Sequence, residues 1–180
     1  VNDKAVPAMS NTDELINKLG DLDNYSVLIP NKKGFDKAKD NGVKEICTVL
    51  CVTDSMNKKN INQTVQETLN NLKEIFKEGL KNGIRTKCYI SVAYHCPYEG
   101  KVDAAYVNDV VGQLIDHHVD ELVIADTIGA ANPKEVSSLL SSLKSQYKDT
   151  SFSCHFHDTR ALGLANVYAS LVAGINKFDS

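Results

Sequence analysis

Residues 121–159 read ELVIADTIGAANPKEVSSLLSSLKSQYKDTSFSCHFHDT and contain one complete strand–helix–strand unit. The apolar run at residues 121–125 and the alternating pattern at residues 151–157 each predict a strand. Between them, Asn132 followed by Pro133 is typical of a helix start. The buried face expected for this helix consists of Val136, Leu139, Leu140 and Leu143. Two consecutive strands joined by a helix run parallel, so this stretch indicates a parallel sheet with helical crossovers.

The same unit recurs along most of the chain. Further strands are predicted at residues 25–30, 45–53, 87–94 and 177–179, and further helices at residues 35–41, 64–81, 104–117 and 162–173. The longest helix begins with Thr64 and Glu67, the pattern of a capping box, and ends before Asn82-Gly83. Its expected apolar face consists of Val65, Leu69, Leu72, Ile75 or Phe76, and Leu80. This alternation predicts an α/β fold in a single domain, residues 1–180.

Two architectures fit the alternation, a TIM (β/α)8 barrel and a doubly wound open sheet. A doubly wound sheet usually carries a glycine-rich phosphate turn, but neither GxGxxG nor GxxxxGK[ST] occurs in the sequence. Polar residues instead follow several predicted strands, at Asp54, residues 96–100, Asp126-Thr127 and residues 157–159. In a barrel these positions form the catalytic face. We therefore predict a TIM barrel that is incomplete, with about six strands instead of eight.

Composition argues against several classes of function. The 180 residues carry 20 Lys and Arg against 23 Asp and Glu, a net charge of −3, which provides no basic face for nucleic acid. No apolar run reaches the length of a bilayer span, so no membrane partner is expected. The five cysteines are an odd number, and four lie in predicted strands, which favours a reduced cytoplasmic protein. The sequence begins at Val1 rather than Met, so we expect a processed chain or part of a longer one.

The strongest local signal for chemistry is the pair His155 and His157. Alternate side chains of a strand share a face, so both imidazoles are expected to point the same way, while Cys154 and Phe156 face the helices. Two imidazoles at the end of a strand can chelate one divalent ion, although further ligands must come from elsewhere. The alternative is a polar strand end with two hydrogen-bonded histidines.

Asp126 ends the apolar strand at residues 121–125 and is followed by Thr127-Ile128-Gly129. At a strand exit it is placed to hold a substrate hydroxyl or to orient a metal-bound water. Aspartate before glycine also commonly caps the turn that follows it. The residue pattern by itself favours the turn.

Two other polar segments have both a binding and a structural interpretation. Residues 96–101, CPYEGK, follow a strand with Tyr89 on one face and could fold over a substrate. Cys96 is a candidate nucleophile, but no feature of the local sequence is expected to lower its pKa. Residues 58–62, KKNIN, are predicted to form a basic loop that could contact phosphates. Both segments could equally be solvated loops.

Several of these segments together resemble the 3-hydroxy-3-methylglutaryl-CoA lyases, which belong to a superfamily of metal-dependent TIM-barrel lyases and synthases. The segments that carry the resemblance are CPYEGK (96–101), DTIGAANP (126–133), HFHDT (155–159), LIPNKKGFDKA (28–38), KKNIN (58–62) and GINKFDS (174–180). They span nearly the whole chain. HxHDT is common to the superfamily, whereas CPYEGK is more specific to the lyases.

The resemblance implies about strands 3 to 8 of a TIM barrel and a divalent cation, Mg²⁺ or Mn²⁺. It implies cleavage of 3-hydroxy-3-methylglutaryl-CoA to acetyl-CoA and acetoacetate, without a nucleotide or redox cofactor, and a homodimer. His155 and His157 match the metal-binding histidines of the family, and His155 is also expected to act in catalysis. Asp126 matches a catalytic, substrate-contacting aspartate, and Tyr89 matches a tyrosine that lines the substrate site.

The sequence also departs from the family pattern. An Arg-Asp motif on the first strand and an acidic residue on the second are missing, as are a glycine-rich loop with a catalytic cysteine and a later asparagine ligand. His95 occupies a position where the family usually has a small residue, and Ala161 a position where it usually has glycine. Two alternatives follow. One is a related barrel enzyme, such as a 2-isopropylmalate or homocitrate synthase or an aldolase, and the other is a catalytically incomplete fragment. We expect residues 1–180 alone to be inactive and, because of open strand edges, to self-associate.

Overall fold

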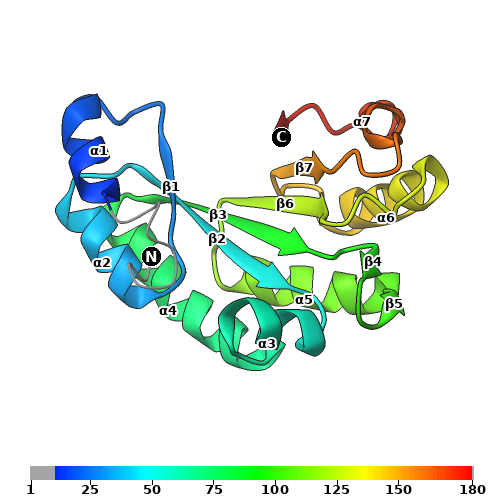
Figure 1. The fold of residues 1–180 in the computed structure, drawn as a ribbon, viewed down its shortest axis with the longest axis horizontal. Helices are drawn as coiled ribbons and strands as arrows, with labels where there is room; N and C mark the ends of the chain where they lie inside the picture. Colours follow the sequence, from blue (N-terminus) through cyan, green and yellow to red (C-terminus); the bar gives the residue numbers. More distant parts are fainter. Residues whose placement is uncertain (1–10, 180) are drawn as a thin grey trace.

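A six-stranded parallel sheet organises the chain. The computed structural model describes residues 11–179. The strands of the sheet are β1 (Ser26–Leu28), β2 (Glu45–Cys51), β3 (Arg85–Ser91), β6 (Glu121–Asp126), β7 (Phe152–Phe156) and β8 (Phe178–Asp179). They are hydrogen-bonded in the order β1-β2-β3-β6-β7-β8, and every neighbouring pair is parallel (Figure 1).

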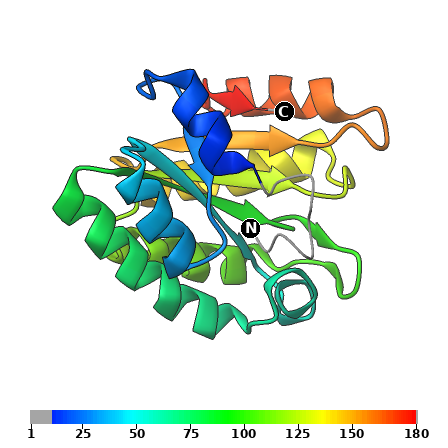
Figure 2. The same cartoon turned by 60° about the vertical axis from the view of Figure 1, so that its left-hand side comes forward.

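Helices connect the strands and cover one face of the curved sheet (Figures 1 and 2). They are α1 (Thr12–Leu19), α2 (Lys32–Asp40), α3 (Asp54–Ile61), α4 (Val65–Asn82), α5 (Ala104–Asp116), α6 (Pro133–Gln146) and α7 (Gly163–Val172). The strand order follows the chain and never reverses, unlike that of a doubly wound sheet. The predicted barrel-type architecture, incomplete within this chain, is therefore confirmed.

The two faces of the sheet have different surroundings. On the face toward the helices, Leu50, Ile90, Ile124 and Cys154 are fully buried. Side chains on the other face, which would line the interior of a barrel, are mostly half-buried and include several polar groups. Residues paired across parallel strands point to the same side, so the register of the strands assigns each side chain to a face.

The long helix α4 follows the sequence prediction closely. The Thr64 hydroxyl accepts a hydrogen bond from the Glu67 amide at 3.1 Å, and the Glu67 carboxylate accepts one from the Thr64 amide at 2.8 Å, which completes the capping box. Gly83 ends the helix with a φ of 66°. Leu80 is the exception, because its side chain is 65% exposed and not part of the apolar face as predicted.

Two local predictions were wrong, and one helix was missed. Lys58 to Ile61 belong to α3 and not to a loop, and α1 was not anticipated. The strand predicted at residues 87–94 ends at Ser91, because Val92 adopts a φ of 53° and its amide donates to the Thr127 hydroxyl at 2.8 Å. The chain then forms the small hairpin of β4 (His95–Cys96) and β5 (Gly100–Lys101). Among the described residues, no helix has the length and apolar character needed to cross a membrane.

Candidate active site

Three polar side chains from three strands meet on the interior face of the sheet. The Nδ1 atom of His155 on β7 lies 2.6 Å from Oδ1 of Asp179 on β8, and these two residues are also paired in the strand register. The hydroxyl of Tyr89 on β3 donates to Oδ2 of the same carboxylate. The rings of Tyr89 and His155 are edge to face, with centroids 6.0 Å apart. Asp179 therefore bridges two residues that were predicted to belong to the site.

His157 lies beside this cluster on the exposed end of the chain segment that follows β7. Its ring centroid is 5.0 Å from that of His155, so the two imidazoles lie side by side as the alternation predicted. No group of three or more His, Cys, Asp or Glu side chains between residues 11 and 179 is arranged to hold a metal ion. The two histidines fit a divalent cation as part of its ligand set, since imidazole nitrogens suit such ions.

Tyr89 is held as a hydrogen-bond donor. Partial burial raises the pKa of its hydroxyl, and the hydrogen bond to the Asp179 carboxylate raises it further. The phenol therefore remains protonated at neutral pH. It presents its ring to His155 and its hydroxyl to Asp179, at the position predicted to line a substrate site.

Asp126 lies on a neighbouring strand but faces the other way. It is paired in register with Phe156, whereas His155 is paired with Ala125, so the Asp126 side chain points toward the helices. Its two carboxylate oxygens accept hydrogen bonds from the amides of Ala130 and Ala131, each at 3.0 Å, and the residue is 1% exposed. This geometry matches the turn-capping alternative. The catalytic and substrate-contacting roles of Asp126 stay predictions, because each carboxylate oxygen keeps a second acceptor site although the residue is only 1% exposed.

The turn capped by Asp126 packs directly against the segment that carries His157. A side chain at Gly129, which has a φ of 60°, would come within 2.8 Å of the His157 carbonyl oxygen and the Thr159 amide. The amide of His157 also donates to the carbonyl oxygen of Asp126 at 3.3 Å. Asp126 thus influences the histidine pair through the backbone that supports it.

An ion network around the buried carboxylate of Glu121 lies at the opposite end of the interior face. The Glu121 side chain, 5% exposed, is contacted by three cations from β3 and the segment before β8. The distances to its oxygens are 3.2 Å from Arg85, 3.4 Å from Lys87 and 3.1 Å from Lys177. Burial acts to raise the pKa of Glu121, but the hydrogen bond from Lys177 and the other partners outweigh it and lower the pKa. Sequence reasoning did not identify this network, because its members are far apart in the chain.

The hairpin that contains CPYEGK is fastened to the start of α3 through Cys96. Its Sγ atom lies 3.1 Å from the Thr53 hydroxyl and 3.5 Å from the Tyr98 amide. Burial acts to raise the pKa of this thiol, but the hydrogen bonds from Thr53, the backbone of Tyr98 and Glu99, and Ser55 lower it overall. The expectation that no local feature lowers the pKa of Cys96 was therefore wrong. The side chain is only 3% exposed, so its observed role is that of an anchor.

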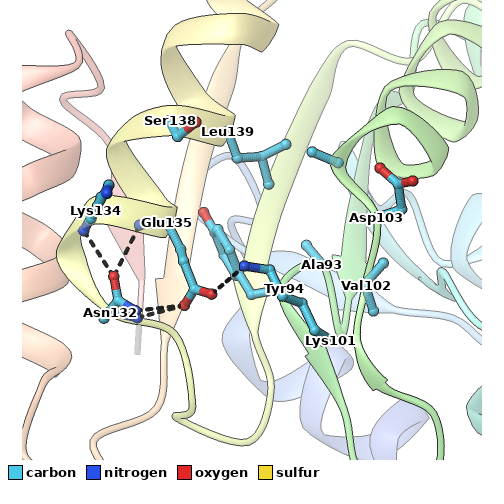
Figure 3. Close-up of a pocket in the computed structure, with 11 residues that line it drawn as sticks. Ala93, Tyr94, Lys101, Val102, Asp103, Asn132, Lys134, Glu135, Ser138 and Leu139 are labelled. Atoms are coloured by element: carbon cyan, nitrogen blue, oxygen red, sulfur yellow. Dashed lines mark hydrogen bonds and ion pairs between the residues drawn. The ribbon is translucent and has the colours of Figure 1, made fainter.

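Two cavities border the carboxyl ends of the strands. One, of about 740 Å³, lies between the hairpin and the start of α6, and the ion pair of Lys101 and Glu135 crosses its edge at 3.0 Å (Figure 3). The second, of about 780 Å³, lies between the segment after β1, the end of α3 and α4. Its lining combines apolar groups such as Leu28 and Ile75 with the polar side chains of Asn31 and Asn60.

Comparison with known proteins identifies the family. Residues 4–180 match the family model described as HMGL-like. The chain belongs to the HMGL-like family. It is 36% identical to the hydroxymethylglutaryl-CoA lyase YngG of Bacillus subtilis, over 86% of this chain and 52% of that protein. The family resemblance inferred from sequence is thereby confirmed.

Solved structures of this family confirm the fold. The HMG-CoA lyase of Brucella melitensis matches with a TM-score of 0.95 and 31% identity, over 100% of this chain and 64% of that one. The HMG-CoA lyase of Acinetobacter baumannii, solved with coenzyme A and 3-methylmalate, matches with a TM-score of 0.93 and 29% identity, over 100% and 59%. The chain thus spans between about half and two thirds of the length of these relatives.

Proposed function

We propose that the protein containing this chain is a hydroxymethylglutaryl-CoA lyase. It would cleave 3-hydroxy-3-methylglutaryl-CoA into acetyl-CoA and acetoacetate with the help of Mg²⁺ or Mn²⁺. One observation carries the proposal: His155, Asp179 and Tyr89 meet beside His157 at the carboxyl ends of parallel strands, in a chain of the HMGL-like family.

The reaction requires a specific set of proton movements. The tertiary hydroxyl of the substrate loses its proton, its oxygen becomes the ketone of acetoacetate, and the bond between the two carbon fragments breaks. The electron pair passes to the acetyl-CoA fragment as an enolate, which then takes up a proton. A bound divalent cation lowers the pKa of the hydroxyl and helps to orient it. No oxidant, reductant or nucleotide is consumed.

Each residue of the cluster has a proposed part in this reaction. His155 and His157 would hold the cation through ring nitrogens, as part of its ligand set. His155 is also our candidate for a part in catalysis, through its hold on the cation that would lower the pKa of the substrate hydroxyl. Tyr89 would contact the substrate with its ring and hydroxyl. For Asp126 we propose support of the turn beneath His157, because both of its carboxylate oxygens are occupied by backbone amides.

The cavity between the segment after β1, the end of α3 and α4 is an argument for an acyl-CoA substrate. Its volume of about 780 Å³ and its apolar lining with a few polar groups suit the pantetheine arm of coenzyme A. Lys58 and Lys59 are exposed on α3, whose end borders the cavity, and their charges would favour the phosphates. The relative from Acinetobacter baumannii was solved with coenzyme A, which is consistent with this class of substrate.

The proposed activity can be tested on the full-length protein. We expect release of acetoacetate from 3-hydroxy-3-methylglutaryl-CoA in the presence of Mg²⁺ or Mn²⁺, and loss of release after chelation. His155→Ala should abolish cleavage and weaken Mn²⁺ binding, whereas substitution of the exposed Asp149 at the other end of the sheet should change neither. Condensation of acetyl-CoA with a 2-oxo acid, without lyase activity, would instead indicate a synthase.

Assembly and location remain predictions. We propose a homo-oligomer, in line with the family resemblance, and a cytoplasmic location, supported by five cysteines that are all free and buried. Light scattering on the purified full-length protein would give the oligomeric state. Fractionation of cells that express the natural gene would give the location.

A further inference from the structure

We propose that Asp179 is a positioning residue, which fixes the orientation and the protonated nitrogen of His155 for cation binding and holds the Tyr89 hydroxyl beside it. This inference rests on the proposed metal-binding role of His155 and deepens it. The sequence analysis placed Asp179 in a segment of the family resemblance, residues 174–180, but assigned it no role; it is the last residue of β8.

The contacts of Asp179 tie together residues that are remote in the sequence. One carboxylate oxygen contacts His155, 24 residues away, at 2.6 Å, and the other contacts Tyr89, 90 residues away. Strand pairing enforces the first contact, because Asp179 and His155 are paired in register on β8 and β7 and point to the same face. The carboxylate therefore joins β3, β7 and β8 at one point of the interior face.

The contact with Asp179 also determines which ring nitrogen of His155 carries the hydrogen. An ionised carboxylate can only accept hydrogen bonds, so both of its neighbours must donate. In the neutral ring, Nδ1 of His155 would then carry the hydrogen in this contact, which leaves the lone pair of Nε2 for a cation. When a carboxylate accepts a hydrogen bond from the second ring nitrogen of a metal-binding histidine, it orients the ring and makes the histidine a more basic ligand.

The surroundings leave the His155 ring little freedom. Tyr89 is edge to face against it on one side, and His157 lies at 5.0 Å with an angle of 65° between the ring planes. The side chain of His155 is 22% exposed. Lys177, two residues before Asp179, donates hydrogen bonds to Glu121 and Ser151. The carboxylate is thus directed at the histidine and the tyrosine.

The test compares Asp179→Asn with His155→Ala and the matched surface variant Asp149→Asn, all in the full-length protein. His155 and Tyr89 contact different oxygens of Asp179, and asparagine replaces one of these oxygens with an NH₂ donor, so it cannot accept both hydrogen bonds in this geometry. We expect Asp179→Asn to weaken Mn²⁺ binding about 10- to 100-fold, the usual effect of removing such a partner. Asp149→Asn should bind Mn²⁺ like the wild type. Titration calorimetry measures all three, with circular dichroism as the check on folding.

A second readout needs no metal. Long-range proton–nitrogen NMR of the histidine rings in the metal-free protein distinguishes Nδ1-protonated from Nε2-protonated imidazole. We expect His155 to be protonated at Nδ1 in the wild type and in Tyr89→Phe, which keeps the contact with Asp179. In Asp179→Asn the mixture should shift toward the Nε2-protonated form.

The outcomes separate this inference from the proposed function. Unchanged Mn²⁺ affinity and an unchanged tautomer in Asp179→Asn would overturn the inference. Loss of binding as complete as in His155→Ala, with the tautomer unchanged, would also overturn it and make Asp179 a direct ligand. Retention of Mn²⁺ by His155→Ala would instead remove the metal assignment from the proposed function, while the NMR result would still report on the contact between Asp179 and His155.

Discussion

Glu135 shows how far one position can alter the chemistry of a side chain. It is the third residue of α6, where it completes a capping box with Asn132. Its carboxylate oxygens also lie 3.2 Å from Nε2 of His95 and 3.0 Å from Nζ of Lys101. Burial acts to raise the pKa of Glu135, but the hydrogen bonds from Lys101, His95 and the Asn132 amide outweigh it and lower the pKa to about 2. The departure of His95 from the family pattern thus has a structural consequence, because His95 helps to fasten the hairpin to α6.

The lowered pKa of Glu135 predicts a pH dependence of stability. A carboxyl whose pKa is lower in the folded state contributes fully above its unfolded value and loses this contribution as pH falls through the folded value. We expect Glu135 to stabilise the protein by about 1–3 kcal/mol at neutral pH. This stabilisation should be lost as the pH falls from about 4.5 to the pKa of about 2 that Glu135 has in the folded state. Urea unfolding across this range measures it. In Glu135→Gln the free energy of unfolding should be lower at pH 7 and fall less steeply on acidification; an identical slope in both proteins would contradict the prediction.

Asp126 offers a test of turn support against catalysis. Both of its carboxylate oxygens accept backbone hydrogen bonds, so Asp126→Asn must lose one of them and should destabilise the protein by roughly 1–3 kcal/mol. Asp158→Asn is the matched control, because Asp158 uses only one oxygen, which accepts from the Gly163 amide, and asparagine retains an oxygen. Urea unfolding compares the two variants. Loss of lyase activity in Asp126→Asn at wild-type stability would instead support the catalytic role.

The sequence predicted some of these residues and not others for a physical reason. His155 and His157 alternate with Cys154 and Phe156, so their shared face could be predicted from the strand period. The run that ends at Asp126 is apolar on both faces, so its direction could not. Asp179 was missed because its partner depends on register between strands. Such pairing is set by the packing of the whole sheet.

Among the helices, α3 and α4 show where sequence patterns succeed and fail. Helix α4 has a capping signal at its start, an apolar stripe and a glycine at its end, so its bounds were predicted almost to the residue. Helix α3 has a polar sequence with only Asn57 buried, so its hydrophobic pattern gave no signal. Its stability depends on hydrogen bonds made by the Asn57 side chain. Oδ1 of Asn57 accepts a hydrogen bond from the Cys51 amide at 3.1 Å. Nδ2 of Asn57 lies within donating distance of the Gln63 and Thr64 carbonyls and the Thr68 hydroxyl.

This network makes Asn57 a strong determinant of stability. Asn57→Ala would remove the partner of the Cys51 amide and of the Gln63 carbonyl, each costing about 1–3 kcal/mol unless water enters, whereas the Thr64 carbonyl and the Thr68 hydroxyl keep other hydrogen bonds. We expect a loss of about 3 kcal/mol or more in the free energy of unfolding. Asn60→Ala, on the exposed side of the same helix, should cost less than about 1 kcal/mol. Chemical denaturation of both variants checks the contrast, and equal losses would show that the Asn57 contacts are not what holds α3.

At the scale of the whole molecule, the regular alternation of strands and helices predicted the architecture, and the family comparison confirmed it. The ion network around Glu121 was beyond sequence reasoning, because its cations come from β3 and from the segment before β8. Within the described residues, β1 and β8 each pair with only one neighbour. The sheet therefore presents two open edges, and open edges tend to pair with other chains.

The open edges predict self-association of a protein limited to residues 1–180. Light scattering at increasing concentration should show species larger than the monomer. Leu28→Lys places a charge on the edge strand β1, where the wild-type side chain is 55% exposed, and should reduce association. Leu80→Lys, at a site 65% exposed on α4, is the matched control and should have little effect. A monomer at all concentrations, or an equal effect of both variants, would contradict the prediction.

The sequential strand order also has a consequence for synthesis on the ribosome. Within the six-stranded sheet, each strand from β2 onward pairs with a strand that has already been translated, so this sheet can grow as the chain emerges. His155 and Tyr89 would be in place well before β8, but the carboxylate that joins them belongs to the last strand of the described chain. A nascent chain stalled with β7 exposed would therefore carry the histidine pair in an unaligned form, and cation affinity would be acquired late, when Asp179 leaves the exit tunnel.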